Sequence, residues 1–223
     1  MSIRNLFKTL FHFRDEEDYD EIVNVNIKHI NERNEFKDRL KLYEEFEKNL
    51  PKIMSRNNSS LIDALVSKNG ELVYILYNKV GKCIFILSPY IIHEATDHAI
   101  NHFPHLFYAF DKEKNRISII ELHSDSGGRD FQTGLHFHEN RGYGTILLKA
   151  LINLAIQKGF DKNSEVTGML SDVDAKDEKE KRRRNMFYHK RGFDVKPDLD
   201  ADNGTVSSTI EQIDNILEKL NRR

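Results

Sequence analysis

Two glycines separated by one residue stand where a predicted strand gives way to a strongly apolar helix, and this junction constrains the fold more than any other feature. Its residues are Glu139-Asn140-Arg141-Gly142-Tyr143-Gly144-Thr145. Glycines let the backbone turn tightly, and the first turn of a helix presents N–H donors at the positive end of the helix dipole. The junction therefore predicts a site for an anion such as phosphate.

Hydrophobic periodicity predicts alternating helices and strands on both sides of this junction. Helices are expected over residues 3–11, 31–49, 61–66, 91–100, 145–157, 177–190 and 209–220. Pro51 should stop or restart the helix at 31–49. Met186 and Phe187 should lie on the buried side of the helix at 177–190. Strands are expected over 72–77, 83–87, 106–110, 117–122 and 164–170, and 135–138 follows a polar loop. Gly159 and Gly192 fall where helix caps belong. This alternation favours a mixed sheet with helices on both faces.

Composition narrows the functional classes. The 223 residues carry 34 Lys plus Arg against 36 Asp plus Glu, a net charge of -2, which argues against a strongly basic nucleic-acid binder. With 39% apolar residues the chain can bury a substantial core. No apolar stretch approaches the roughly 20 residues of a membrane helix, and the single Cys83 lies in an apolar run and suits a buried strand. We expect a cytoplasmic protein without nucleic-acid or membrane partners, although residues 3–11 could form either a docked terminal helix or a membrane-surface helix.

The glycine junction resembles the cofactor loop of the GNAT superfamily of acetyl-coenzyme A dependent N-acetyltransferases. The loop of that family reads [QR]xxGx[GA] before an apolar helix, and residues 140–148 follow this pattern. A second element downstream, Phe187-Tyr188-His189-Lys190-Arg191-Gly192-Phe193, is similar to the family's aromatic-Tyr-x-x-x-Gly-Phe. The resemblance covers residues 104–200 and reaches back toward residue 60.

The resemblance implies an α/β (α+β) acyltransferase fold, with a mixed, mostly antiparallel central sheet flanked by helices. Residues 1–60 would form an N-terminal helical extension, 61–205 the N-acetyltransferase domain and 206–223 a C-terminal helix. The implied function is transfer of an acetyl group from acetyl-coenzyme A to a primary amine of a small molecule, peptide or protein, by direct attack.

The resemblance also implies roles for individual residues. Backbone N–H groups of Arg141, Gly142, Tyr143, Gly144 and Thr145 would hold the pyrophosphate of the cofactor. The strand edge at Leu135, His136 and Phe137 would pair with the pantetheine arm. Tyr188 matches the general acid, because a phenol with a pKa near 10 keeps its proton at neutral pH and can give it to a departing thiolate. The alternative for Tyr188 is a core tyrosine whose ring packs and whose hydroxyl finds a partner.

Several side chains could accept the proton of the incoming amine. Glu121, His123, His136 and His138 lie on or beside the strands leading to the junction, and we assign Glu121 and His136. A histidine with a pKa near 6.5 suits this task, and a hydrogen-bonded structural pair is the alternative for His136 and His138. Two histidines without a third ligand make a poor metal centre, so no metal site is predicted there.

Two further clusters are interpreted as solvated helix faces. One contains His93, His98, His102 and His105, whose spacing is not that of a known zinc motif. The other is the basic run at residues 179–184, which follows acidic residues in the order that the helix dipole favours. These cations could instead reach a phosphate of the cofactor or contact nucleic acid.

Two departures from the family pattern keep a second function open. Glu139 stands where the family has Gln or Arg, and Lys181 stands where many members carry Asn. Both suit a catalytically silent protein that binds coenzyme A as a sensor or presents a partner surface. The apolar stripe of residues 210–220 could pack within the chain or form a homodimer.

Overall fold

The computed structural model describes residues 16–67, 70–89, 103–123, 142–170, 178–197 and 204–221. The chain divides into two compact units, Met1–Lys48 and Asn49–Arg223. The predicted helices at 3–11 and 91–100 and the predicted strand at 135–138 lie outside the described residues. No helix within the described ranges is both long and apolar enough to cross a membrane.

The first described element, helix α2 (Glu16–Arg56), is much longer than the expected helix at 31–49. It continues through Pro51, so the prediction that this proline stops or restarts the helix was wrong. A proline inside a helix removes one backbone hydrogen bond at a cost of about 3 kcal/mol, which a long helix can absorb. The helix ends at two asparagines instead. The Asn57 side-chain amide donates to the Ile53 carbonyl at 3.0 Å, and Asn58 has a φ of 44°.

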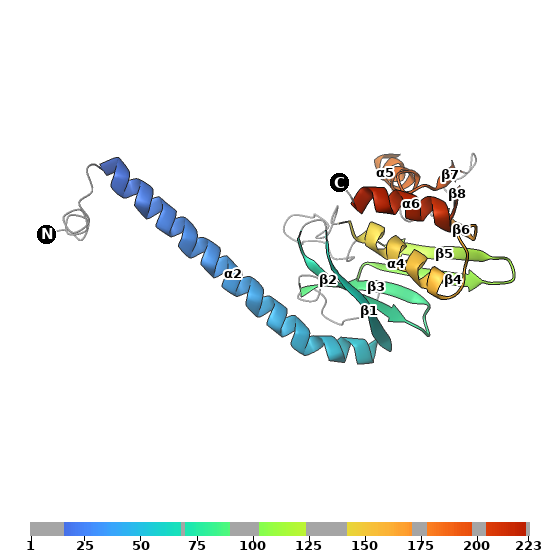
Figure 1. The fold of residues 1–223 in the computed structure, drawn as a ribbon, viewed down its shortest axis with the longest axis horizontal. Helices are drawn as coiled ribbons and strands as arrows, with labels where there is room; N and C mark the ends of the chain where they lie inside the picture. Colours follow the sequence, from blue (N-terminus) through green and yellow to red (C-terminus); the bar gives the residue numbers. More distant parts are fainter. Residues whose placement is uncertain are drawn as a thin grey trace. The chain divides into compact units, whose positions relative to one another are not determined.

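A sheet forms the centre of the second unit (Figure 1), and the described residues contribute eight strands to it. Its strands are β1 (Ser59–Val66), β2 (Leu72–Asn78), β3 (Cys83–Leu87), β4 (His105–Asp111), β5 (Arg116–His123), β6 (Glu165–Leu170), β7 (Asp194–Pro197) and β8 (Gly204–Thr209). The order across the sheet is β1-β2-β3-β4-β5-β6-β8-β7. Among these pairs β5 and β6 are parallel, and the other six are antiparallel. The sheet is therefore mixed and mostly antiparallel, as predicted.

Within the described ranges, the helices that accompany the sheet are α4 (Tyr143–Gln157), α5 (Glu178–His189) and α6 (Ile210–Asn221). Helix α4 connects the parallel strands β5 and β6 and packs on β3, β4 and β5 (Figure 1). Its apolar face, which includes Leu147, Leu148 and Leu151, is fully buried. On α5 the expectation for Met186 was wrong, because that side chain is 53% exposed. The helix turns Tyr188 inward instead.

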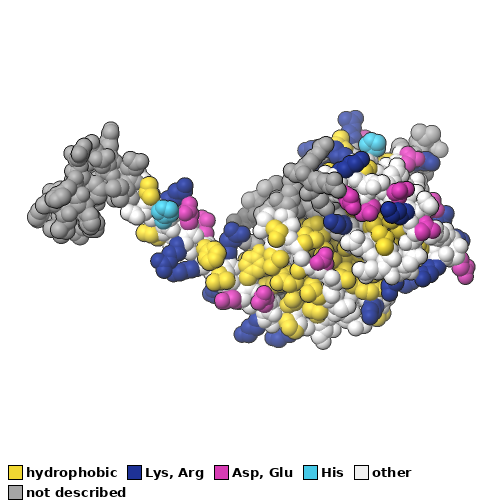
Figure 2. All heavy atoms as spheres, in the orientation of Figure 1, with side chains coloured by type: hydrophobic (Ala, Val, Ile, Leu, Met, Phe, Trp, Pro, Cys, Tyr) yellow, Lys and Arg dark blue, Asp and Glu magenta, His cyan; other side chains and the backbone are white. Residues whose placement is uncertain are grey.

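The strands predicted between residues 72 and 122 and at 164–170 are confirmed, whereas the helix predicted at 61–66 was wrong. These residues form β1, which pairs with β2 from Ser59↔Asn78 to Val66↔Leu72. Tertiary pairing has overridden the local helical pattern. Hydrophobic side chains gather on the face around this strand (Figure 2), and Leu61, Ile62 and Val66 are exposed.

Helices α4 and α5 end in the same hydrogen-bonded turn, a Schellman motif. After α5 the Phe193 N–H donates to the Tyr188 carbonyl at 3.2 Å, and the Gly192 N–H donates to the His189 carbonyl at 3.1 Å. The rings of Tyr188 and Phe193 supply the accompanying apolar contact, with centroids 5.3 Å apart. Gly159 caps α4 equivalently, and both glycines have a left-handed φ, 84° and 85°. Both predicted caps are confirmed.

Replacing Gly192 by alanine should destabilise the fold more than the same change at Gly159. A Cβ at Gly192 would lie 2.8 Å from Ile216 Cδ1 and 3.2 Å from the Gln212 carbonyl oxygen, whereas a Cβ at Gly159 meets nothing within 4 Å. We expect Gly159→Ala to cost about 1–2 kcal/mol from backbone conformation alone. Gly192→Ala should cost about 2–4 kcal/mol because the clash adds to this. Urea unfolding of both variants measures the difference, and equal losses would contradict the packing seen at Gly192.

Candidate functional site

The parallel strands β5 and β6 pair over only part of their length. Their register runs from Arg116↔Glu165 to Ile119↔Gly168. Beyond this point β5 stays paired with β4 and β6 stays paired with β8. The next residues, Ile120 and Met169, are 63% and 76% exposed. The carboxyl ends of the two parallel strands therefore part, and such an edge is where α/β sheets commonly bind ligands.

Helix α4 follows β5 in the chain, and no described side chain caps its N-terminus. Its N-cap, Gly142, has a φ of 83° and makes no side-chain capping bond, and the first turn has no acidic residue. The Thr145 N–H donates to the Gly142 carbonyl at 3.0 Å, so this predicted phosphate donor is already used inside the helix. Gly142, Tyr143 and Gly144 thus carry the first-turn donors expected to face an anion.

Arg191 reaches this helix terminus from the turn after α5. Its Nε and Nη2 donate to Thr145 Oγ1 at 3.0 and 2.6 Å, and its Nη1 donates to the Phe187 carbonyl at 2.8 Å. The guanidinium carbon lies 3.8 Å from the centroid of the Phe187 ring, a cation–π geometry. Arg191 is thereby fixed against the third residue of α4.

The charge of Arg191 is poorly compensated. Burial lowers the pKa of its guanidinium to about 10, and within the part of the chain that the structure describes it forms no ion pair with a carboxylate. A cation beside a helix N-terminus also opposes the helix dipole. An anionic ligand would interact favourably with both. Sequence reasoning did not assign Arg191 a role, although its place directly before the capping Gly192, inside the element that resembles the family, was an available signal.

Tyr188 is 8% exposed at the end of α5. Its ring meets Phe187 and Phe193 edge-on, with centroids 5.2 and 5.3 Å apart. These aromatic contacts fix the ring, and the same turn carries Arg191.

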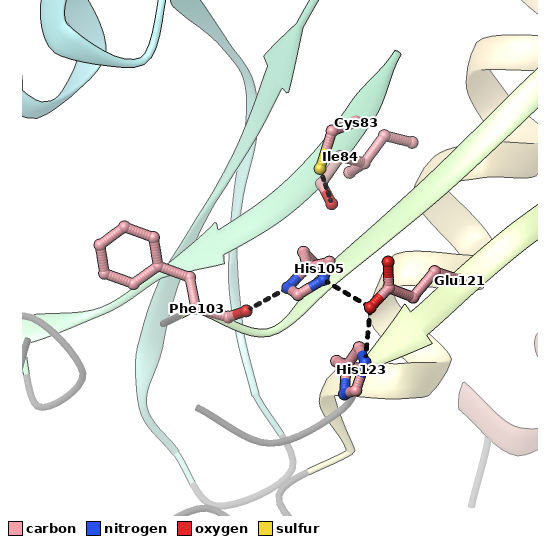
Figure 3. A network of polar contacts seen from close by, with 6 residues as sticks. All are labelled: Cys83, Ile84, Phe103, His105, Glu121 and His123. Atoms are coloured by element: carbon pink, nitrogen blue, oxygen red, sulfur yellow. Dashed lines mark hydrogen bonds and ion pairs between the residues drawn. The ribbon is translucent and has the colours of Figure 1, made fainter. Parts of the chain in front are cut away.

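Glu121 belongs to a three-residue cluster on β4 and β5 (Figure 3). Its Oε1 lies 2.7 Å from His123 Nε2 and 3.7 Å from His105 Nε2. The His105 ring is buried, and its Nδ1 lies 2.7 Å from the Phe103 carbonyl oxygen. Burial lowers the pKa of His105. The sequence placed His105 on a helix face with other histidines, but it is the first residue of β4, so that interpretation was wrong for this residue.

A register shift in the β4–β5 pair places Glu121 and His123 on the same face as His105. Phe107 pairs with Glu121 while its neighbour Tyr108 pairs with Ile119, which leaves Ile120 as an extra residue in β5. Such bulges re-aim the side chains that follow them. In a regular strand without the bulge, residues 119 and 121 would share a face, so Glu121 would have pointed to the side of the buried Ile119.

The side chain of Tyr143 is structural. Its hydroxyl donates to Glu71 Oε2 at 2.6 Å, and the two residues are 1% and 3% exposed. Glu71 is held in turn by Ser67, whose N–H donates to the Glu71 carbonyl at 2.7 Å. The β1–β2 turn thus anchors the first residue of α4.

The remaining assigned residues Leu135, His136, Phe137 and Arg141 lie outside the described residues, as does His138. Cys83 is fully buried in β3, as predicted, and burial raises the pKa of its thiol to about 12. A protonated buried thiol is a poor nucleophile.

Comparisons with known proteins do not place the chain in a family. No protein-family model matches the chain, and no curated protein sequence matches it. Among solved structures it is similar to the crystal structure of nourseothricin acetyltransferase, with 10% identity and a TM-score of 0.33 over 68% of this chain and 87% of that one. A likeness at this level carries no weight for function.

Removing the Tyr143 hydroxyl should destabilise the junction. We expect Tyr143→Phe to lower the free energy of unfolding by about 1–3 kcal/mol, because the buried Glu71 carboxyl loses a hydrogen-bond donor. Urea unfolding, repeated in the Glu71→Ala background, forms a double-mutant cycle. The cost of Tyr143→Phe should shrink in that background, and an unchanged cost would show that the two side chains are not coupled.

Proposed function

We propose that this protein is an acetyl-coenzyme A dependent N-acetyltransferase of the GNAT type. The observation that carries the proposal is the direct contact between Arg191 and Thr145. It joins the two sequence elements that resemble the family, residues 140–148 and 187–193. The contact lies at the start of the helix that follows β5 and returns the chain to the parallel partner β6. This arrangement supports a site for the pyrophosphate of coenzyme A.

In the proposed complex the anion interacts with the first turn of α4 and with Arg191. Backbone N–H groups of Gly142, Tyr143 and Gly144 supply short-range donors. The guanidinium adds a charge in a partly desolvated position, where electrostatic interactions are stronger than in water. The pantetheine edge at residues 135–137 completes the site as the sequence resemblance implies.

The proposed reaction is a direct transfer. A neutral primary amine attacks the thioester carbonyl, a C–N bond forms, and the C–S bond breaks. The departing thiolate takes the phenolic proton of Tyr188, and the proton of the amine passes to the Glu121 carboxylate. The acceptor is a small amine or a peptide, and no nucleic acid or membrane takes part. A catalytically silent coenzyme A-binding protein is the second outcome that the experiments below distinguish.

Calorimetry with acetyl-coenzyme A tests the binding half of the proposal. We expect binding to the wild-type protein and about 10- to 100-fold weaker binding to Arg191→Gln, since a charge-assisted hydrogen bond contributes about 1.5–3 kcal/mol. The neighbouring cation Lys190 is exposed, so Lys190→Gln is the matched control and should bind like the wild type. A folded wild-type protein that does not bind acetyl-coenzyme A would end the proposal.

Turnover tests the catalytic half. Tyr188→Phe should lower kcat about 100-fold or more, in the range that general acid–base catalysis contributes, while the affinity for acetyl-coenzyme A stays similar because the ring and its packing remain. Thiol release in the presence of a panel of primary amines measures this. Retained binding without transfer to any amine would identify the silent protein, and unchanged turnover of the variant would refute the role of Tyr188.

A further inference from the structure

The side chains of His105, Glu121 and His123 converge from two adjacent strands (Figure 3). Each offers one ligand atom, and the three atoms all lie within 4.8 Å of one another. Two imidazole nitrogens and one carboxylate oxygen form a ligand set that protein zinc sites and related transition-metal sites use. The cluster differs from the histidine pairs considered in the sequence, because it combines residues from both strands of a hairpin.

One of the two distances between these atoms is already close to the spacing around a tetrahedral ion, and the other is shorter. Zinc bonds to histidine nitrogen and carboxylate oxygen are about 2.0–2.2 Å long, so ligand atoms around one ion lie about 3.4 Å apart. Here Glu121 Oε1 lies 3.7 Å from His105 Nε2 and 2.7 Å from His123 Nε2. An ion would replace the short contact between Glu121 and His123, and rotation of half-exposed side chains is enough to open it.

The hydrogen bond of His105 prepares its ring for a metal. A carbonyl oxygen only accepts hydrogen bonds, so the contact with the Phe103 carbonyl requires a proton on His105 Nδ1. In the neutral ring Nε2 then carries the lone pair and faces Glu121 Oε1, which is also an acceptor. Two acceptors that face each other are stabilised by a cation between them. Histidine ligands of metals typically donate their other N–H to a carbonyl or carboxylate in this way.

The cluster combines one buried side chain with two accessible ones, all held on paired strands. His105 and His123 are directly paired across β4 and β5, and the extra residue Ile120 aligns Glu121 with them. The side chain of His105 is 4% exposed, whereas those of Glu121 and His123 are 44% and 40% exposed. A buried anchor with two accessible ligands allows an ion to enter and leaves room for a water molecule, as in sites with three protein ligands.

We propose that His105, Glu121 and His123 form a binding site for a divalent transition-metal ion of the zinc class. The reaction proposed above uses Glu121 and gives His105 and His123 no role. An ion held by that carboxylate would prevent it from accepting the proton of the amine. Metal binding itself is independent of acetyl transfer, because it can be measured without acetyl-coenzyme A.

The test uses the full chain after removal of metals with a chelator. Zinc chloride is titrated in by calorimetry, and cobalt chloride is followed through its visible absorption, which reports the ligands and geometry of the bound ion. We expect one ion per chain with histidine ligation. Glu121→Gln and His123→Ala should each weaken binding more than about 100-fold, because loss of an outer-shell partner alone typically costs about 10- to 100-fold. Both positions are half-exposed, so these variants should fold.

His29→Ala is the matched control. His29 is an exposed histidine on α2 with its Nδ1 3.4 Å from Glu32 Oε2, a histidine–carboxylate pair outside the cluster. Its loss should leave the affinity for zinc unchanged. Failure of the wild-type protein to bind zinc or cobalt would overturn the proposal. So would binding that Glu121→Gln and His123→Ala leave intact, since the ion would then be held elsewhere. Either result would leave the acetyl-coenzyme A measurements standing.

Discussion

The pairing of β5 with β6 governs the arrangement of the second unit. Antiparallel neighbours can be joined by short turns, but parallel strands need a crossover connection of about a dozen residues or more, usually a helix. Helix α4 belongs to that crossover, because it lies between β5 and β6 in the chain. Because the two strands stop pairing after Ile119 and Gly168, the helix terminus and the separated strand ends occupy the same edge. Both functional proposals concern residues at or near this edge.

Two positive charges lie close together at this edge of the sheet. The partial positive charge of the α4 terminus and the guanidinium of Arg191 meet at Thr145, and neither is neutralised by a carboxylate among the described residues. Repulsion of this kind is unfavourable in an isolated protein. Binding of an anion would reduce this repulsion. The repulsion that destabilises the free protein would therefore also favour anion binding. The net charge of -2 shows that such a site depends on local donors and not on the overall field.

The sequence predicts much of the scaffold because local signals act there. Alternating β-branched and aromatic residues identify β2 to β6, and Gly159 and Gly192 mark helix ends by their backbone requirements. Local patterns predict the wrong element where pairing with residues distant in the sequence determines the structure. Residues 61–66 have a helical pattern, yet pairing with β2 makes them a strand, and Pro51 lies within α2. In the site, the bulge at Ile120 has no local signature, so the convergence of Glu121 with His105 could not be read from alternation. Arg191 acts through Thr145, 46 residues away.

The bond between Glu71 and Tyr143 has a consequence for the order of folding. It closes a segment of 72 residues, and closing long segments costs chain entropy before the contact can contribute. Contacts of such sequence separation slow folding and are characteristic of late assembly. The hairpins β2–β3 and β4–β5 need only short closures, so they can form without the glycine junction. We therefore expect these hairpins to form before the junction is anchored, so that the proposed anion site is completed late in folding.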